Sequence, residues 1–372
     1  DHIKTLSRLP NSEKQTFWIG ESFIPKPEYV CLQNGLLSIE EHIFGSKEAC
    51  HRHNRDYFTT NILPYEYSRD AQCERWKKFL TQTFEDEEVI ELLQEWFGYN
   101  LIADTSHHKF MIFCGQGANG KSVILTVLTE LLGRSNVSSL GLESFNQKNT
   151  FMLNALTGVL ANITNELNEI DKASEGLLKS YVAGELITID RKYRDPIQVK
   201  PQARLTFATN VLPRFTDRSD GIWRRLLFIP FTRQILDESK QDKRLGTASY
   251  WIDSGEMNGI FLWALDGLKR LKKNKKFTEP ASSQEALNDY RRFSNPIMEF
   301  FESNYEWKEG ASCSKGDTYC DYKRWTLERG NQPLNEQNFA VALKKHFPRV
   351  LPTKSLTTIK RGPWGNKRDR PW

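Results

Sequence analysis

The segment KFMIFCGQGANGKSVILTVLTELLG constrains the fold more than any other part of this 372-residue chain. The apolar run Phe110 to Cys114 predicts a buried strand. Apolar residues from Val123 to Leu132 recur at helical spacing, and Gly133 predicts the end of that helix. Between strand and helix lies the pattern GxxxxGKS, residues 115–122. Strand, glycine-rich loop and helix in this order predict a binding site for the phosphates of a nucleotide.

Glycine and charge explain how such a loop holds phosphate. Gly115, Gly117 and Gly120 let backbone N–H groups curl inward around a phosphate, at the positive end of the following helix. We expect Lys121 to neutralise the β- and γ-phosphates and the Ser122 hydroxyl to ligate Mg²⁺, so ATP and Mg²⁺ are the expected cofactors. The alternative is a glycine-rich turn with an exposed lysine. The predicted nucleotide-binding residues are Gly115, Gln116, Gly117, Ala118, Asn119, Gly120, Lys121 and Ser122.

A carboxylate should lie near this loop, to hold the metal and to orient the attacking water. The best candidate is Glu166, which follows an apolar, β-branched strand from Val159 to Thr164 that we expect next to the loop strand. The usual acidic pair is here Asn165 and Glu166, so Glu166 would polarise the water nearly alone. Alternatively, Glu166 is a carboxylate at the start of a helix, where the positive end of the helix dipole favours an acidic residue.

Two further apolar strands are flanked by polar residues. ARLTFATN predicts a strand with Asn210 at its tip, whose amide can hydrogen-bond the attacking water or the γ-phosphate, although asparagine at such a place is often a turn former. RSDGIWRRLLFIPF places Arg224 and Arg225 before the apolar strand Leu226 to Phe231. These arginines could pair with nearby aspartates, or they could reach into the nucleotide site of a neighbouring subunit.

The segment GELITIDRKYRDPIQVKPQ predicts two short strands around a tight, charged turn, Arg191 to Pro196. Between positions 191 and 233, 10 Lys and Arg face 3 Asp and Glu, and 10 minus 3 leaves +7. A hairpin with a basic and aromatic tip is suited to grip a phosphate and to stack on a base or sugar. The alternative is a solvated loop. The candidate nucleic-acid contacts are Arg191, Lys192, Tyr193 and Arg194.

Taken in order, GQGANGKS, a strand ending in NE, TFATNVLPRF and SDGIWRRLLFIPF resemble the superfamily 3 helicase domain of phage and plasmid primase-helicases. The resemblance implies an α/β fold, a compact αβα ATPase core of the extended AAA+ kind with its phosphate loop. It also implies hexameric rings and translocation on single-stranded nucleic acid. In this family a hairpin between the second and third motifs lines the central channel, a role carried first to Lys192 and then to Tyr193 and Arg194.

The resemblance also implies roles for single residues. Lys121 and Ser122 match the phosphate and Mg²⁺ ligands, and Glu166 matches the catalytic carboxylate and second metal-holding group. Asn210 matches the polar sensor of the third motif. Arg224 or Arg225 matches the arginine finger that acts across the subunit boundary. The departure from many members is Asn165, which bears on the rate of hydrolysis more than on nucleotide binding.

The N-terminal flank, LQNGLLSIEEH to ELLQEWFGYNL, resembles the region that precedes the ATPase in these proteins. Asn34-Gly35 predicts a hairpin turn, and Glu74 to Leu101 predicts two amphipathic helices. Their apolar faces favour core positions over base stacking for Trp76, Phe79, Leu80, Leu92, Leu93, Trp96 and Phe97. Cys50, His51, His53 and Cys73 match no usual zinc spacing, so we expect no metal there.

The C-terminal flank is basic: residues 310–372 contain 13 Lys and Arg against 5 Asp and Glu, and 13 minus 5 gives +8. Because the net charge of the whole chain is +5, the remaining residues carry −3. Two short helices with Gly330 as a stop and Asn335 as a cap, followed by a two-stranded wing in residues 353–372, are similar to a winged-helix domain. Gln337, Lys344 and Lys345 would then lie on or near the helix that enters a DNA groove. The alternatives are a protein-docking module or solvated lysines.

Composition sets the remaining expectations. Six cysteines without CxxC spacing fit a reducing compartment, and no stretch is apolar enough to span a membrane, so we expect a cytoplasmic protein, in a bacterial host if phage or plasmid encoded. The absence of an initial Met suggests a fragment, with a primase or polymerase domain upstream. We expect an N-terminal hairpin and α-rich helical domain at 1–106, the ATPase core at 107–304 and the winged helix at 305–372.

The resulting prediction is an ATP-hydrolysing replicative helicase or translocase that acts on single-stranded DNA as a homo-hexameric ring. Asn165 in place of an acid keeps a second hypothesis open, a weakly hydrolysing, nucleotide-dependent platform that loads a primase or polymerase on DNA. A small-molecule kinase is the third hypothesis. It lacks a recognisable lid of clustered arginines.

Overall fold

The structure, a computed structural model, describes residues 17–18, 28–147, 149–165, 172–213, 215, 220–234, 242–308, 313–330, 332–347 and 358–361. The chain forms two compact units, residues 1–287 and residues 288–372. The boundary falls inside helix α9 (Ala281–Phe293). Within the described residues no helix combines the length and the apolar character needed to cross a membrane.

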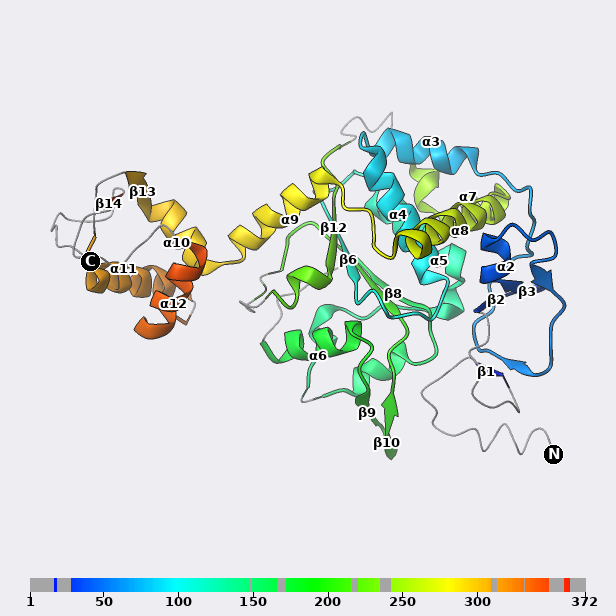
Figure 1. The fold of residues 1–372 in the computed structure, drawn as a ribbon, viewed down its shortest axis with the longest axis horizontal. Helices are drawn as coiled ribbons and strands as arrows, with labels where there is room; N and C mark the ends of the chain where they lie inside the picture. Colours follow the sequence, from blue (N-terminus) through cyan, green and yellow to red (C-terminus); the bar gives the residue numbers. More distant parts are fainter. Residues whose placement is uncertain are drawn as a thin grey trace. The chain divides into compact units, whose positions relative to one another are not determined.

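A parallel five-stranded sheet lies at the centre of the first unit (Figure 1). Its spatial order is β12-β6-β11-β8-β7. The strands are β6 (Phe110–Cys114), β7 (Val137–Ser138), β8 (Ala161–Thr164), β11 (Arg204–Thr209) and β12 (Leu226–Pro230). The apolar runs predicted to be strands therefore form strands, because side chains buried on both faces suit a sheet that helices cover. This architecture is consistent with a nucleotide-binding α/β core.

Helices from distant parts of the sequence cover this sheet. They are α3 (Glu74–Thr83), α4 (Glu87–Asn100), α5 (Lys121–Leu132), α6 (Lys172–Val182), α7 (Ala248–Asp253) and α8 (Met257–Asn274). Short 3-10 helices occur at Arg134–Asn136, Leu142–Ser144, Phe151–Leu156, Trp223–Arg225 and Lys243–Gly246. One apolar core joins α3, α4, α5 and α8 to the central strands, and it includes Trp76, Trp96 and Trp251, each fully buried. The seven apolar residues predicted to face inward on α3 and α4 are all buried, as expected of core positions.

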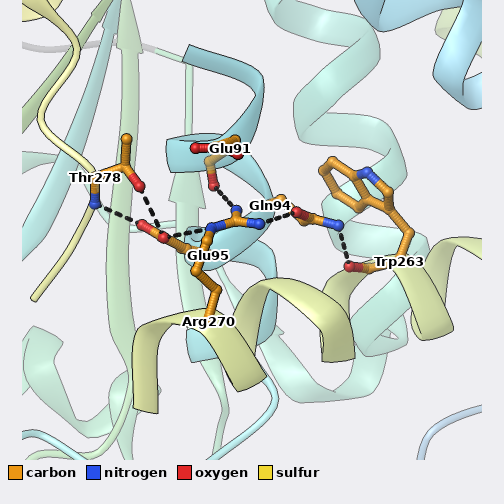
Figure 2. A network of polar contacts seen from close by, with 6 residues as sticks. All are labelled: Glu91, Gln94, Glu95, Trp263, Arg270 and Thr278. Atoms are coloured by element: carbon orange, nitrogen blue, oxygen red, sulfur yellow. Dashed lines mark hydrogen bonds and ion pairs between the residues drawn. The ribbon is translucent and has the colours of Figure 1, made fainter. Parts of the chain in front are cut away.

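Helices α4 and α8 approach each other closely, since a Cβ on Gly98 would meet the carbonyl oxygen of Ala264 at 2.3 Å. A buried polar network joins the same two helices (Figure 2). The Glu95 carboxylate, with no exposed surface, accepts from Arg270 Nε at 2.8 Å and from the backbone N–H of Thr278 at 2.7 Å. Arg270 also donates to Gln94 Oε1 at 2.8 Å and to the carbonyl oxygen of Glu91 at 2.7 Å. The carboxylate and the guanidinium thus each have several partners, as buried charges require.

The N-terminal part of the first unit contributes small antiparallel sheets. They comprise β1 (Phe17–Trp18), β5 (Tyr57–Phe58), β2 (Tyr29–Leu32), β3 (Gly35–Ser38) and β4 (Cys50–His51), with helix α2 (Ile39–Ile43) after β3. The predicted hairpin is present, but its turn residues are Gln33 and Asn34, because Gly35 already pairs with Leu32. Gly35 is needed for another reason: a Cβ there would meet the carbonyl oxygen of His51 at 2.3 Å.

The second unit contains α10 (Pro296–Asn304), β13 (Tyr305–Lys308), α11 (Lys315–Glu328), α12 (Glu336–His346) and β14 (Thr358–Arg361). Gly330, at φ 71°, and Asn335, whose side chain accepts from the N–H of Asn338, lie between the two helices as predicted. Strand β14 pairs with β13, which precedes α11, and not with a second strand inside residues 353–372. The sequence pattern does not reveal β13, and the rest of the predicted wing lies outside the described residues.

Candidate functional site

The parallel sheet has two chemically different edges. The phosphate loop and Asn210 follow the carboxyl ends of β6 and β11. Arg224 and Arg225 precede β12, at the amino edge. Since Leu226 pairs with the first residue of β6 and the loop follows its last, these arginines lie a strand length, roughly 16 Å, from the loop. Among the described residues, the structure therefore separates the phosphate loop and Asn210 from the two arginines by the length of a strand.

Lys121, the first residue of α5, is held in the phosphate loop by the loop's own oxygens. Its Nζ donates to the carbonyl oxygen of Gly115 and to Asn119 Oδ1, the latter at 3.1 Å. Only 8% of its surface is exposed. Burial lowers the pKa of Lys121 from its ordinary value, while the nearby Cys114 thiol acts in the opposite direction. The Lys121 ammonium is thus fixed at the start of α5 and poorly solvated. A poorly solvated cation gains from an anionic partner.

The loop backbone takes conformations that suit an anion cradle. Ala118 (φ 59°) and Gly120 (φ 89°) are left-handed, and Gly120 precedes the first N–H groups of α5. A Cβ on Gly117 would contact nothing, so this residue borders open space. The Ser122 side chain is exposed and lies one residue into the helix. Glycine freedom, an α-helix start, a lysine and a hydroxyl fit a nucleotide triphosphate and its metal ion.

The strand next to the loop strand is β11, not β8. Strand β11 lies between β6 and β8, and the N–H of Gly115 donates to the carbonyl oxygen of Thr209 at 3.2 Å. The exposed Asn210 therefore directly follows the residue that contacts the loop. The prediction that β8 adjoins β6 is wrong, because β11, from later in the chain, pairs with β6 on one side and with β8 on the other. Asn165 is exposed at the end of β8, and Glu166 lies outside the described residues.

Arg224 and Arg225 differ in their surroundings. Arg224 is exposed, and its carbonyl oxygen accepts from Lys109 Nζ at 2.7 Å. Arg225 is half-buried, and its Nη1 donates to the carbonyl oxygen of Gly221 at 2.7 Å. Burial, followed by the neighbouring Arg224, lowers the pKa of Arg225. Neither forms an ion pair within the described part of the chain, so the salt-bridge alternative gains no support there.

The predicted hairpin is present between α6 and β11, as β9 (Ile187–Arg191) and β10 (Arg194–Val199), and it extends from the sheet (Figure 1). Its turn consists of Lys192 and Tyr193, while Arg191 and Arg194 are paired strand residues. Tyr193 is 92% exposed at φ 60°, and Lys192 Nζ lies 5.3 Å from its ring centroid. An exposed aromatic ring and an ammonium thus share the tip.

Sequence patterns do not reveal the residues that support these two places. At the loop, Phe79 of α3 would be 3.1 Å from a Cβ on Gly120, and Gln234 donates to the carbonyl oxygen of Gly117 at 3.3 Å. At the hairpin, Thr150 Oγ1 donates to Asp190 Oδ2 at 2.9 Å. Each pair is far apart in sequence, so only the folded chain brings it together.

The described C-terminal candidates lie on one helix. Gln337 and Lys344 are exposed on α12, and Lys345 belongs to the same helix, although its side chain lies outside the described ones. Phe339 and Leu343 of α12 face the core of the second unit. The exposed face of α12 combines Gln337 and Lys344 with the apolar Val341, which is 67% exposed.

Comparisons with known proteins match three parts of the chain. Residues 113–225 match a family of unknown function, DUF5906. Residues 20–85 match the D5 N terminal like family, and residues 292–370 match the Poxvirus D5 protein-like family. These regions correspond to the phosphate loop through the tandem arginines, to the N-terminal flank and to the basic C-terminal flank.

Curated relatives come from viruses. "Putative helicase L207/L206" of Acanthamoeba polyphaga mimivirus is 28% identical over 231 residues, 57% of this chain and 22% of that protein. "Putative helicase 184R" of Invertebrate iridescent virus 6 is 23% identical over 350 residues, 82% of this chain and 36% of that protein. "Putative helicase 022R" of Frog virus 3 is 20% identical over 275 residues, 67% of this chain and 27% of that protein.

The chain thus spans between about a fifth and about a third of the length of these relatives. A solved structure, the C-terminal region of NrS-1, superposes with a TM-score of 0.45 and 14% identity over 64% of this chain and 57% of that one, a similarity too distant to carry an argument. The matches support a relationship to D5-like helicase proteins of viruses.

Proposed function

We propose that this chain is an ATP-dependent helicase or translocase of superfamily 3, with an AAA+-like core, that acts on single-stranded DNA in viral replication. The observation that carries the proposal is the division of the predicted site between the two edges of one sheet. Lys121, Ser122 and Asn210 share the carboxyl edge, while Arg224 and Arg225 are a strand length away. A complete site then needs the carboxyl edge of one subunit and the amino edge of the next.

In this proposal each edge has its own task. Backbone N–H groups of residues 115–121 and the Lys121 ammonium bind the phosphates of ATP, and Ser122 with Glu166 holds Mg²⁺, which supplies charge neutralisation during phosphoryl transfer. Asn210 orients the attacking water. The guanidinium of Arg225, or of Arg224, stabilises negative charge on the phosphates of the neighbouring subunit. A closed ring, as in a homo-hexamer, gives every subunit such a neighbour.

The hairpin and the second unit supply the nucleic-acid contacts of the proposal. Lys192, Tyr193 and Arg194 can bind a phosphate and stack on a base. The order helix, strand, helix, helix, strand in the second unit supports a winged-helix domain with α12, including Lys344 and Lys345, as the DNA-facing helix. We further propose that the full-length protein carries a primase or polymerase domain and works in the cytoplasm of its host.

The direct test is ATP turnover by the purified full chain with and without single-stranded DNA. Wild-type protein should hydrolyse ATP, and DNA should accelerate it. Lys121→Ala should lower turnover by at least about a hundredfold, because it removes a preorganised charge from the transition state. Turnover that Lys121→Ala leaves unchanged would rule out the proposed site.

One observation favours a second function, a nucleotide-dependent platform that loads a primase or polymerase. Asn165, exposed at the end of β8, cannot assist a metal ion as a carboxylate does. For the platform, ATP binds tightly while turnover stays slow with and without DNA, and Asn165→Asp raises turnover. For the helicase, DNA accelerates the wild-type protein.

A further inference from the structure

A group of cations from three segments lies at the amino edge of the sheet, apart from the hairpin tip. We call it the basic face: Lys273, Lys275 and Lys276 at the end of α8, Lys109 before β6 and Arg224 before β12. Two contacts connect its parts. The ring of His107 lies 5.3 Å from that of Phe277, and two residues later Lys109 Nζ donates to the carbonyl oxygen of Arg224 at 2.7 Å.

The lysine-rich end of α8 is fixed in place. Lys275 is left-handed at φ 57°, and its N–H donates to the carbonyl oxygen of Leu271 at 2.8 Å. The next residue but one, Phe277, is 3% exposed, and Thr278 donates through its N–H and its hydroxyl to the buried Glu95 carboxylate (Figure 2). Two anchored residues, Phe277 and Thr278, thus directly follow the exposed lysines. The backbone that carries these lysines is therefore held in a defined position.

The basic face has more cations than are needed to stabilise the dipole at the end of α8. Lys272 pairs with Glu28 at 3.0 Å, and with Lys273 it already lies in the last turn, where cations stabilise the helix dipole. Lys275 and Lys276 follow the helix, and both are exposed. Five cations on the face oppose the nearby carboxylates of Glu279 and Asp104, and 5 minus 2 leaves an excess of +3.

The chemistry of the face differs from that of the hairpin tip. The tip offers the exposed ring of Tyr193, whereas Phe277 and Tyr99 beside the basic face are buried. Flexible ammonium groups bind phosphates as point charges, and the buried rings of Phe277 and Tyr99 offer no surface on which a base could stack. Such a surface suits a phosphate backbone irrespective of sequence.

We propose that the basic face binds the phosphate backbone of a single-stranded nucleic acid, as a contact separate from the hairpin. The inference rests on the proposed function, because a chain that handles a strand at its hairpin must guide that strand across its surface. Lys273, Lys275 and Lys276 make the principal contacts, with Lys109 and Arg224 extending the surface toward β12.

The test uses the full chain and a fluorescein-labelled oligothymidylate, with affinity measured by anisotropy at several salt concentrations. A triple variant, Lys273→Gln, Lys275→Gln and Lys276→Gln, should bind roughly ten- to a hundredfold more weakly at about 0.1 M salt. The slope of log affinity against log salt should flatten by about 2. Its DNA-independent ATP turnover should match the wild type, and its melting temperature should fall only slightly, because Lys273 is lost from the last turn of α8.

The matched control is Lys47→Gln, Lys77→Gln and Lys78→Gln, which removes the same charge from exposed lysines of the same unit. Equal weakening by both triples would reduce the effect to net charge and overturn the proposal. So would a lower melting temperature with unchanged affinity, because the lysines would then serve only the end of α8. Tighter binding of duplex than of single strands would overturn the choice of ligand. If wild-type protein binds no oligothymidylate at all, the proposed function fails together with the inference.

Discussion

The two edges of the central sheet are built in opposite ways. At the carboxyl edge, Lys121 is buried and bonded to its own loop, and Phe79 and Gln234 confine that loop from outside. At the amino edge, Arg224 and the lysines at the end of α8 are exposed on anchored segments, while Lys109 is half-buried. The cation of one edge is held inside its loop, and the cations of the other edge are mostly open to solvent.

In the proposed function, this difference explains how one sheet could serve two kinds of ligand. A phosphate group needs converging N–H donors in a fixed loop, which a sharp strand-to-helix connection provides. A subunit or a nucleic-acid strand needs an accessible surface with cations held at known positions. The buried network of Glu95 and Arg270 anchors the segment that follows the exposed lysines, as such a surface requires.

Removal of one arginine at the amino edge should have the largest effect, a loss of ATP turnover. We expect Arg225→Ala to lower ATP turnover about a thousandfold, as loss of an arginine finger does, while nucleotide binding stays unchanged because the loop is a strand length away. Turnover and the binding of a fluorescent ATP analogue are the two measurements.

The control is Arg244→Ala, which removes an exposed arginine that pairs with Asp242 and lies over the ring of Tyr250. It should leave both quantities unaltered. Equal losses of turnover in the two variants would exclude a specific role for Arg225.

Loss of the buried network of Glu95 and Arg270 should have the next largest effect, on the stability of the fold. Arg270→Met leaves the Glu95 carboxylate buried without its guanidinium, so the free energy of unfolding should fall by about 3 kcal/mol. Chemical denaturation monitored by tryptophan fluorescence measures it. Arg55→Met is the matched control, since both side chains of its pair with Asp56 are exposed, at 89% and 56%, and it should change stability by less than about 0.5 kcal/mol. Similar losses in both variants would contradict a special role for the buried network.

The hairpin tip should show a smaller effect that is confined to nucleic acid. Tyr193→Ser removes an exposed ring, so the Kd for single-stranded DNA should rise about tenfold without a change in melting temperature. Phe44→Ser is the control, because Phe44 is also exposed, at 81%, but lies in the N-terminal region. Unchanged DNA affinity in Tyr193→Ser would remove the stacking role of the tip.

The smallest effect concerns pH at the amino edge. Burial, then the charges of Arg204, Lys109 and Lys272, lowers the pKa of His107, while Asp104 opposes them. The unfolded chain therefore binds more protons below the ordinary histidine pKa, and folded-state stability falls as pH decreases through that value. His107→Gln should weaken this acid sensitivity, measured as melting temperature against pH. A steeper fall in the variant would show that the sign is wrong.

The sequence predicts the carboxyl edge better than the amino edge. The loop, β6 and α5 follow from glycines, from the spacing of apolar residues and from a helix stop. All of these lie inside the 25-residue segment KFMIFCGQGANGKSVILTVLTELLG. The strand and turn of the hairpin are also local. Both are recognisable because the residues that define them are neighbours in the chain.

Long-range relations escape such patterns. The placement of β11 between β6 and β8, the pairing of β14 with β13, and the contact of α3 with Gly120 depend on packing of distant segments. So does the distance between the arginines and Lys121, which no spacing in the sequence gives. Glu166 stays a prediction, as do the ring and the roles of Asn210 and Lys345.

The most direct measurement of a site shared between subunits is complementation by mixing. Lys121→Ala protein lacks the carboxyl-edge cation but keeps Arg225, and Arg225→Ala protein has the reverse defect. In mixed assemblies some interfaces combine an intact loop with an intact arginine, so ATP turnover should reappear on mixing two nearly inactive proteins. Turnover that stays at the sum of the two separate values, in mixtures shown to co-assemble, would contradict the division of the site between two edges of neighbouring subunits.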